Sequence, residues 1–310
     1  MRPRLILLTV IAASAAITTN AQTYSRGQNV SPAYEGWEQA PDGTMYFLFG
    51  YMNRNWEEEV DVPIGLDNNI EPGGPDQGQP THFLPRRNRF TFRVRVPKDF
   101  GNKEMVWTLT TKGKTEKAYA SLKTDYFIDD VVIASETGAL GAGTSSPEIR
   151  ANKRPDIRIE QKAVTVRVGE PIDLVAWVTD DGVPKRPAPS AAQLAALARA
   201  ANASPSAPRN PVLNPPSRVT VNKRTGLHMM WFVYRGANTV RFDPMQVKPW
   251  EDTRAGANSP WAPLWTPPQM PADGKIVTKA TFSAPGTYVL RARADDGALY
   301  DDEELTVTVR

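Results

Sequence analysis

Few side chains in this chain are of the kinds that perform covalent catalysis. The 310 residues contain no cysteine and two histidines, His82 and His228. Neither histidine has a second one at the spacing of a metal site. The sequence also lacks a Gly-x-Ser-x-Gly turn, a His-Glu-x-x-His helix and a glycine-rich dinucleotide loop. We therefore expect a protein that is not an enzyme, with structural or surface roles for both histidines.

Carboxylates leave one hydrolytic alternative open. Two acids that face each other across roughly 5 to 9.5 Å suffice for glycoside cleavage, and the chain has 34 Asp and Glu residues. A carboxylate-dependent glycoside hydrolase, or an accessory of one, is therefore the second alternative function. The densest acidic run, Glu57 to Glu59, is better explained as a solvated edge that discourages strand pairing.

Paired aspartates could bind calcium. Ca²⁺ takes six to eight oxygen ligands and tolerates irregular loops. Three aspartate pairs flank predicted turns that could meet at one end of a sandwich: Asp180, Asp181, Asp295, Asp296, Asp301 and Asp302. A second acidic cluster runs from Asp67 to Asp76. Asp-Gly is also a common hairpin turn that needs no ion. We expect no cofactor other than calcium, and calcium only at such a cluster.

Three tryptophans in a proline-rich stretch could bind sugars. Trp250, Trp261 and Trp265 could stack on sugar rings while Asp252 and Asn258 bond the hydroxyl groups. A carbohydrate-binding protein is therefore the first alternative function. The competing interpretation is a loop whose indoles cover an open core edge, since large aromatics are usually well buried.

The elements that must position these side chains are strands. Apolar residues alternate with Arg89, Arg93 and Arg95 over residues 89–96, which predicts one dry and one wet face. A glycine turn at Gly113 separates two such segments, and the same layout recurs over residues 287–309. The sequence predicts an all-β fold of two immunoglobulin-like antiparallel β-sandwich modules, with proline-rich insertions in the second.

Composition shifts divide the chain into four parts. A charged start, an apolar run and small residues near Ala21 are typical of a secretory signal peptide. A Gly/Ala/Ser-rich stretch is typical of a joint between modules. The predicted parts are a signal peptide at 1–21, an N-terminal sandwich at 22–133, a linker at 134–155, and a C-terminal sandwich at 156–310 with insertions at 184–217 and 243–274.

The C-terminal module resembles a known repeat. Val168-Gly-Glu-Pro171, Asp180-Asp-Gly182, Met230-Trp231, Ala280-Thr-Phe-Ser-Ala-Pro-Gly-Thr-Tyr288 and Asp295-Asp-Gly297 occur in the order of the polycystic-kidney-disease-type repeat. The resemblance covers residues 156–310 and departs from the repeat in both insertions. It implies an immunoglobulin-like sandwich that acts as an extracellular spacer or adhesive unit. The whole chain looks like an uncharacterised secreted bacterial protein.

Charge argues against a nucleic-acid partner. The chain has 37 Lys and Arg against 34 Asp and Glu, a net charge of +3, and the predicted signal peptide carries Arg2 and Arg4 without any acid. The exported chain is thus nearly neutral, whereas nucleic-acid binding needs a clustered basic excess. We expect a secreted or periplasmic interaction, adhesion or structural module of the cell envelope, with no membrane span in the mature chain. Its partner would be an envelope protein or a polysaccharide.

Overall fold

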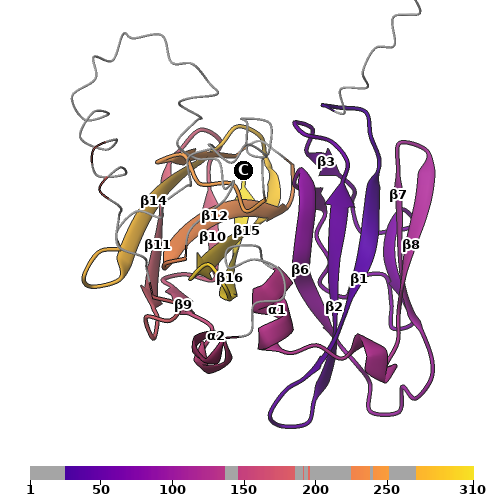
Figure 1. Ribbon diagram of the computed structural model, residues 1–310. Coiled ribbons are helices and arrows are strands. Elements are labelled where there is room, and N and C mark those ends of the chain that lie inside the picture. Colours follow the sequence, from indigo (N-terminus) through magenta and orange to yellow (C-terminus); the bar gives the residue numbers. More distant parts are fainter. Residues whose placement is uncertain are drawn as a thin grey trace, which may run out of the picture.

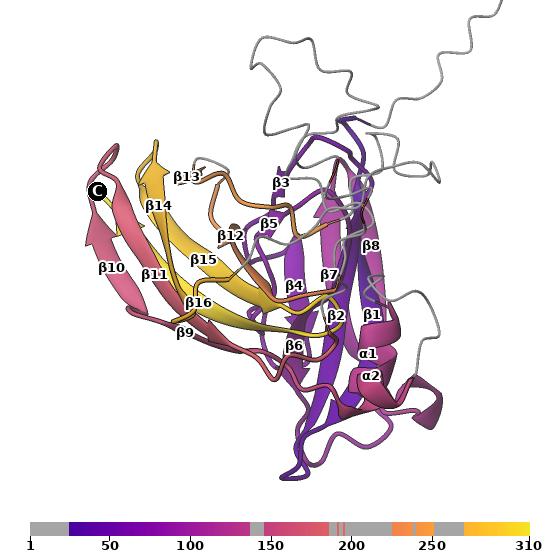
Figure 2. The ribbon, with the colours of Figure 1, turned by 60° about the vertical axis from the view of Figure 1, so that its left-hand side comes forward.

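The chain folds into two β-sandwiches that stand side by side (Figure 1). The computed structural model describes residues 25–136, 146–185, 191, 195, 225–237, 240–250 and 270–310. The predicted signal peptide and most of both predicted insertions lie outside the described residues. Turned by 60°, the strands of the second sandwich run at a steep angle to those of the first (Figure 2).

The first sandwich is built from two three-stranded antiparallel sheets and a short ribbon. One sheet has the order β1-β2-β6 and the other the order β4-β7-β8. The strands are β1 (Val30–Gln39), β2 (Met45–Asn53), β6 (Arg86–Arg95), β4 (Asn68–Glu71), β7 (Met105–Thr111) and β8 (Lys114–Ala120), with β3 (Val60–Asp61) and β5 (His82–Phe83) in the ribbon.

Aromatic side chains fill the space between these sheets. Trp107 is fully buried, and its indole N–H donates to Asn68 Oδ1 at 3.0 Å. Phe49 and Phe92 stack with ring centroids 5.3 Å apart. The aromatic run of β2 thus forms a packed core, as its strand propensity predicts.

The second sandwich has two four-stranded sheets, ordered β13-β14-β11-β9 and β10-β16-β15-β12. Its strands are β9 (Asp156–Ile159), β10 (Ala163–Val166), β11 (Ile172–Thr179), β12 (His228–Arg235), β13 (Val240–Asp243), β14 (Lys275–Phe282), β15 (Gly286–Asp295) and β16 (Tyr300–Val309). In immunoglobulin notation the first sheet is D-E-B-A and the second contains G-F-C. The short β10 pairs with β16 in parallel.

Two further features belong to the immunoglobulin architecture. Trp231 on β12, the strand in position C, is 1% exposed in the core. Tyr288 near the start of β15 donates its hydroxyl to the Ala284 carbonyl at 2.9 Å, as in a tyrosine corner. The predicted all-β fold with immunoglobulin-like sandwiches is confirmed. The narrower resemblance to the polycystic-kidney-disease-type repeat stays a prediction.

Short helices lie where the two sandwiches meet (Figure 1). They are α1 (Asp130–Glu136) and α2 (Pro147–Ala151), whereas the 3₁₀ turn η1 (Thr124–Tyr126) lies beside β1 of the first module. Ile133 of α1 and Ile149 of α2 are buried in one cluster with Leu48 of the first module and Leu299 and Tyr300 of the second. The helices therefore help to join the modules.

A bulge interrupts the pairing of β2 with β6. Phe49 pairs with Phe92 and Tyr51 with Asn88, so three residues of β6 lie opposite Gly50 alone. Phe90 in this bulge has a φ of 48°, which is uncommon for a bulky residue. The bulge turns a short stretch of backbone away from the sheet, toward the second module.

We expect Gly50→Ala to lower the free energy of unfolding by about 1 to 3 kcal/mol, as overpacking does. A Cβ at position 50 would overlap Glu35 Oε1 and lie 2.5 Å from the Asn88 carbonyl oxygen. Urea unfolding measures the effect. Gly113→Asn is the control, because a Cβ there meets nothing within 4 Å and asparagine tolerates the positive φ of that turn. Equal midpoints for the two variants would refute the packing argument.

Candidate functional site: the junction between the sandwiches

The outer face of β12 is covered by the first module. Along β12 the side chains alternate between two cores: Met230, Phe232 and Tyr234 join the core cluster of the first module, whereas Trp231 and Val233 belong to the second module's own core. Both faces of this strand are therefore buried, which is why residues 230–234 form a nearly continuous apolar run.

The second module contacts the β6 bulge through its backbone carbonyls. Arg291 Nη1 donates to the Thr91 carbonyl at 2.5 Å. The Tyr300 hydroxyl lies 2.8 Å from the Phe90 carbonyl and 3.3 Å from that of Arg89. Buried carbonyls need hydrogen-bond donors, and here the donors come from β15 and β16, at least 200 residues away in the sequence.

A charge ladder runs along the same face of β15 and β16. Arg291 lies opposite Glu304, and Arg293 lies opposite Asp302. Arg293 Nε is 2.8 Å from Asp302 Oδ1, and Arg291 pairs with Glu304. Their side chains are only 7% and 11% exposed. Charges this deeply buried need closely placed counter-ions, and β16 of the same module supplies them, so that Arg291 is held in place to donate to the first module.

Aromatic rings and counter-ions stabilise the two cations of the ladder. The Arg291 guanidinium lies 3.4 Å from the ring centroid of Tyr234, and that of Arg293 lies 3.8 Å from the Tyr300 ring. Burial opposes the charged form of Arg293, but Asp302 outweighs it and raises the pKa of Arg293 above its usual value. Both arginines thus remain charged inside the junction.

Arg235 makes a second link between the modules. Its guanidinium pairs with both oxygens of Asp76, at 2.7 and 2.9 Å, and its Nε donates to the Gln79 carbonyl at 2.9 Å. The Thr81 amide donates to the Tyr234 carbonyl at 3.3 Å. The end of β12 is thereby tied to the loop between β4 and β5.

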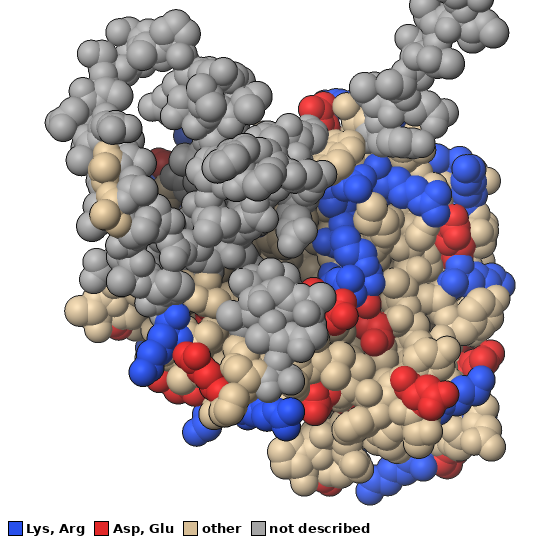
Figure 3. All heavy atoms as spheres, viewed as in Figure 1, with Lys and Arg blue, Asp and Glu red and all other residues tan. Residues whose placement is uncertain are grey.

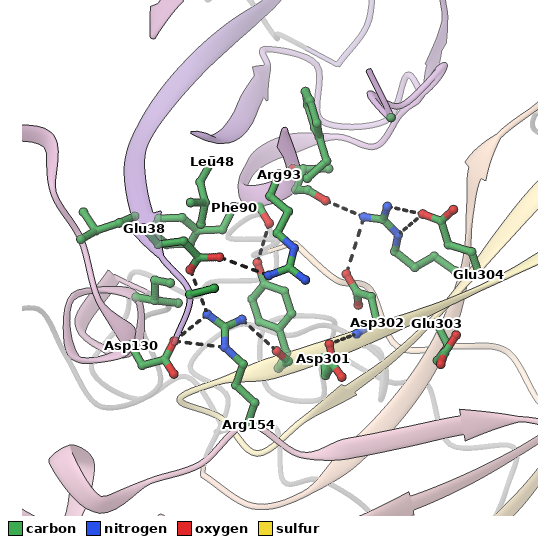
Figure 4. Close-up of a pocket in the computed structure, with 18 of the residues that line it drawn as sticks. Glu38, Leu48, Phe90, Arg93, Asp130, Arg154, Asp301, Asp302, Glu303 and Glu304 are labelled. Atoms are coloured by element: carbon green, nitrogen blue, oxygen red, sulfur yellow. Dashed lines mark hydrogen bonds and ion pairs between the residues drawn. The ribbon is translucent and has the colours of Figure 1, made fainter. Parts of the chain in front are cut away.

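A cleft of about 1190 Å³ opens beside these contacts, with walls from both modules. One wall is β16 from Tyr300 to Glu304, and the other combines the end of β1, the β6 bulge and α1 (Figure 4). Eight acids and five bases line the cleft, which gives it a negative balance. Acidic and basic side chains lie next to one another on the surface at the junction (Figure 3).

Arg154 bridges the two walls (Figure 4). Its Nη2 lies 2.6 Å from Asp130 Oδ1 and 3.7 Å from Glu38 Oε2, and its Nη1 donates to the Tyr300 carbonyl at 3.4 Å. Asp301 next to it has a raised pKa, mainly because of burial and also because of the neighbouring Asp302. Within the described part of the chain, Asp301 forms no ion pair, although the nearby charge of Arg154 partly offsets the rise in its pKa.

His82 forms a buried ion cluster near this junction. Its Nδ1 lies 2.7 Å from Asp61 Oδ1, and its Nε2 lies 3.1 Å from Glu59 Oε2. Burial alone would lower the pKa of His82, but the hydrogen bonds to the two carboxylates outweigh it and raise the pKa to about 9. Glu59 was predicted to lie on a solvated edge; it instead serves as a partner of this imidazolium.

The aspartates predicted to bind calcium cap turns or pair with arginine. Asp295 Oδ1 accepts from the Gly297 amide at 2.6 Å, and Asp180 Oδ2 accepts from that of Gly182 at 2.9 Å. Asp181 Oδ1 accepts from the Val183 amide at 2.9 Å. Asp302 pairs with Arg293. Across the described ranges, no three His, Asp or Glu side chains are grouped to hold a metal ion, and calcium binding stays a prediction.

Asp296 is the most perturbed of these aspartates. Burial raises its pKa to about 7, although its Oδ1 accepts from the Ala298 and Leu299 amides at 2.6 and 2.7 Å. Its Oδ2 accepts from Asn152 Nδ2 at 3.0 Å. A carboxyl that is protonated near pH 7 resembles an amide in shape and hydrogen bonding.

We therefore expect Asp296→Asn to stabilise the protein at pH 8 relative to wild type. The folded pKa lies above the ordinary value of 3.8, so the contribution of Asp296 is fully present below pH 3.8 and is lost as the pH rises through about 7. The difference in unfolding free energy between Asp296→Asn and wild type, measured by urea unfolding, should therefore grow in favour of the variant as the pH rises over this range. Asp181→Asn, at an exposed turn, should show no such trend. A pH-independent difference for Asp296→Asn would contradict this account.

The predicted tryptophan platform is only partly within the described residues. Trp250 is 7% exposed and packs in the core cluster that includes β12, which matches the interpretation of an indole covering a core edge. Trp261, Trp265, Asp252 and Asn258 lie outside the described residues. A sugar platform at Trp261 and Trp265 stays a prediction.

The chain matches no family model and no curated protein. Solved structures with similar folds include a conjugative transposon lipoprotein from Bacteroides eggerthii, at 8% identity over 49% of this chain and 95% of that one, with a TM-score of 0.25. Domains 4 and 5 of the S-layer protein SbsC match at 8% identity over 67% and 65%, with a TM-score of 0.23. The D00-D0 domain of intimin matches at 10% identity over 90% and 100%, with a TM-score of 0.23. Likeness this weak carries no argument about function.

The described helices are too short and too polar to cross a bilayer.

Proposed function

We propose that this protein is a non-enzymatic structural and interaction module of the bacterial cell envelope, secreted or periplasmic. Its two immunoglobulin-like sandwiches would be held at a fixed angle, and the junction cleft would receive a partner protein or polysaccharide. The observation that carries the proposal is the set of contacts that cross the junction: Arg291 donates to the Thr91 carbonyl, Tyr300 to the Phe90 carbonyl, and Arg235 pairs with Asp76.

Contacts of this kind across the junction favour a stiff pair of domains. Interfaces between domains of one chain usually resemble transient ones and permit relative motion. Sliding at this junction would separate Arg291 from the Thr91 carbonyl and Arg235 from Asp76. It would leave buried polar groups without hydrogen-bond partners, which is unfavourable. The angle between the sandwiches is therefore a built-in property, as a spacer or scaffold requires.

Export is supported by the sequence. The charged start, apolar run and small residues of positions 1–21 have the order of a secretory signal. The chain has no cysteine, so its folding does not depend on disulfide formation and is compatible with an extracytoplasmic compartment.

Retention on native envelope fractions tests the proposal. Residues 22–310, immobilised through the C-terminus, are incubated with intact envelope and with envelope digested by protease. Retention of a specific component from intact envelope is expected; loss after proteolysis identifies a protein partner, and persistence identifies a polysaccharide. No retention from either fraction, or the release of reducing sugars from the polysaccharide, would overturn the proposal.

A further inference from the structure

Half of β16 has an open outer edge. β15 pairs with all ten residues of β16 on one side. On the other side β10 pairs only with Thr306–Val309. Among the described residues, no strand pairs with the outer edge of residues 300–305, and five of these six residues line the junction cleft.

The backbone N–H and C=O groups of the even-numbered residues of β16 point toward this edge. The Thr306 amide donates to the Lys162 carbonyl and the Arg310 amide to the Val166 carbonyl, both at 2.9 Å and both on the β10 side. Because backbone groups alternate sides along a strand, those of Asp302 and Glu304 also point outward. The Asp302 amide is bonded to Asp301 Oδ1 at 2.9 Å. The Asp302 carbonyl and both backbone groups of Glu304 therefore face the cleft.

Acidic side chains restrict what can pair there. Asp301 and Glu303 flank the open backbone groups, and Asp129 and Asp130 lie on the opposite wall of the cleft. Glu303 pairs with Lys162 and Asp130 with Arg154, whereas Asp129 and Asp301 form no ion pair with the described residues, and acids outnumber bases around the cleft as a whole. Charges on an edge strand prevent pairing between copies of the same chain, since each copy brings the same acids. A basic strand would meet complementary charge instead.

We propose that the junction cleft binds an extended peptide segment rich in Lys or Arg, which adds to β16 as a strand beside residues 302–304, in line with β10. Main-chain hydrogen bonds to Asp302 and Glu304 would give affinity, and the acids would select basic side chains, as in other cases of strand addition. This inference rests on the proposed interaction function and specifies the chemistry of a protein partner.

Three fluorescein-labelled octapeptides test it against residues 22–310. One alternates Lys with Thr and one alternates Glu with Thr. The third, the Lys-Pro peptide, repeats Lys-Pro-Pro, so that prolines fall on both sides of the extended chain and remove most of the N–H groups that a ladder needs on either side. We expect saturable binding of the Lys-Thr peptide, no binding of the Glu-Thr peptide, and at least tenfold weaker binding of the Lys-Pro peptide. Amide exchange at Glu304 should slow at least tenfold only with the Lys-Thr peptide.

Matched variants locate the site. The double variant Asp301→Asn and Glu303→Gln should weaken Lys-Thr binding at least fivefold while keeping the side-chain shapes. Asp173→Asn, an exposed acid on β11 outside the cleft, should change it less than twofold. Circular dichroism and a urea curve establish that each variant is folded.

Two results would overturn the strand-addition proposal: no saturable binding of the Lys-Thr peptide, or equal binding of the Lys-Pro peptide without protection of the Glu304 amide. If either occurs while the envelope fractions still retain a component, only the strand addition is wrong. If envelope retention fails as well, the proposed function is also wrong.

Discussion

Replacing Arg291 with alanine is expected to lower the free energy of unfolding by about 3 kcal/mol. The guanidinium pairs with Glu304 and lies 3.5 Å from Asp302, and it donates to the Thr91 carbonyl. Removing one partner of a buried ion pair typically costs about 3 to 5 kcal/mol. Because Glu304 is half exposed, water can partly replace the lost cation, and the lower end of that range applies.

Urea unfolding at pH 7 measures this effect. Arg167→Ala is the matched control, because Arg167 is 82% exposed and, among the described residues, pairs with Glu170 in the turn between β10 and β11; exposed pairs contribute about 0 to 1 kcal/mol. Equal losses for the two variants would mean that the buried contacts of Arg291 at the junction do not stabilise the protein.

The second large effect is a loss of stability at alkaline pH that depends on His82. Its folded pKa of about 9 lies above the ordinary value of 6.5. The stabilisation is therefore fully present below pH 6.5 and is lost as the pH rises through about 9. The difference between the folded and the ordinary pKa of His82 corresponds to about 3 kcal/mol of unfolding free energy.

The comparison of wild type with His82→Gln isolates that contribution, because tyrosines and lysines titrate in both proteins. The difference in unfolding free energy should shrink by about 3 kcal/mol between pH 6 and pH 10. A difference that stays constant over this range would show that His82 is not held as an imidazolium by Asp61 and Glu59.

The alternation of apolar and polar residues predicted the two sandwiches, but it did not predict which surfaces of one sandwich the other covers. Alternation over residues 89–96 indicates a strand, and β6 occupies most of that segment. The same alternation places Thr91 on a wet face, yet Thr91 is buried, because the second module packs against the bulge. Period-two patterning states which residues share a face; it contains no information about a neighbouring domain.

The charge ladder shows the same limit. Arg291 and Arg293 alternate with small apolar residues on β15, which predicts a solvated face, but both arginines are buried. A signal was nevertheless present, since the hairpin turn at Gly297 places Asp302 and Glu304 opposite them. Complementary charges directly across a hairpin, next to the aromatic run of β12, could have indicated an interface.

The contacts of the predicted site residues come from distant parts of the chain, so the local sequence could not predict them. Trp250 occupies a core that includes residues of the first module, a contact that no local spacing encodes. Asp302 pairs with an arginine that faces the junction. Turn capping by Asp180 and Asp295 follows directly from Asx-turn chemistry, which the sequence offers as the alternative to calcium binding at these residues.

The central claim is that the two sandwiches keep one fixed angle, and pulsed electron paramagnetic resonance tests it directly. Because the chain has no cysteine, nitroxides can be attached at Tyr119→Cys and Val277→Cys, two exposed positions in different modules. One narrow distance distribution is predicted, broadened by Arg291→Ala. A broad distribution in the doubly labelled protein with Arg291 intact would contradict the account.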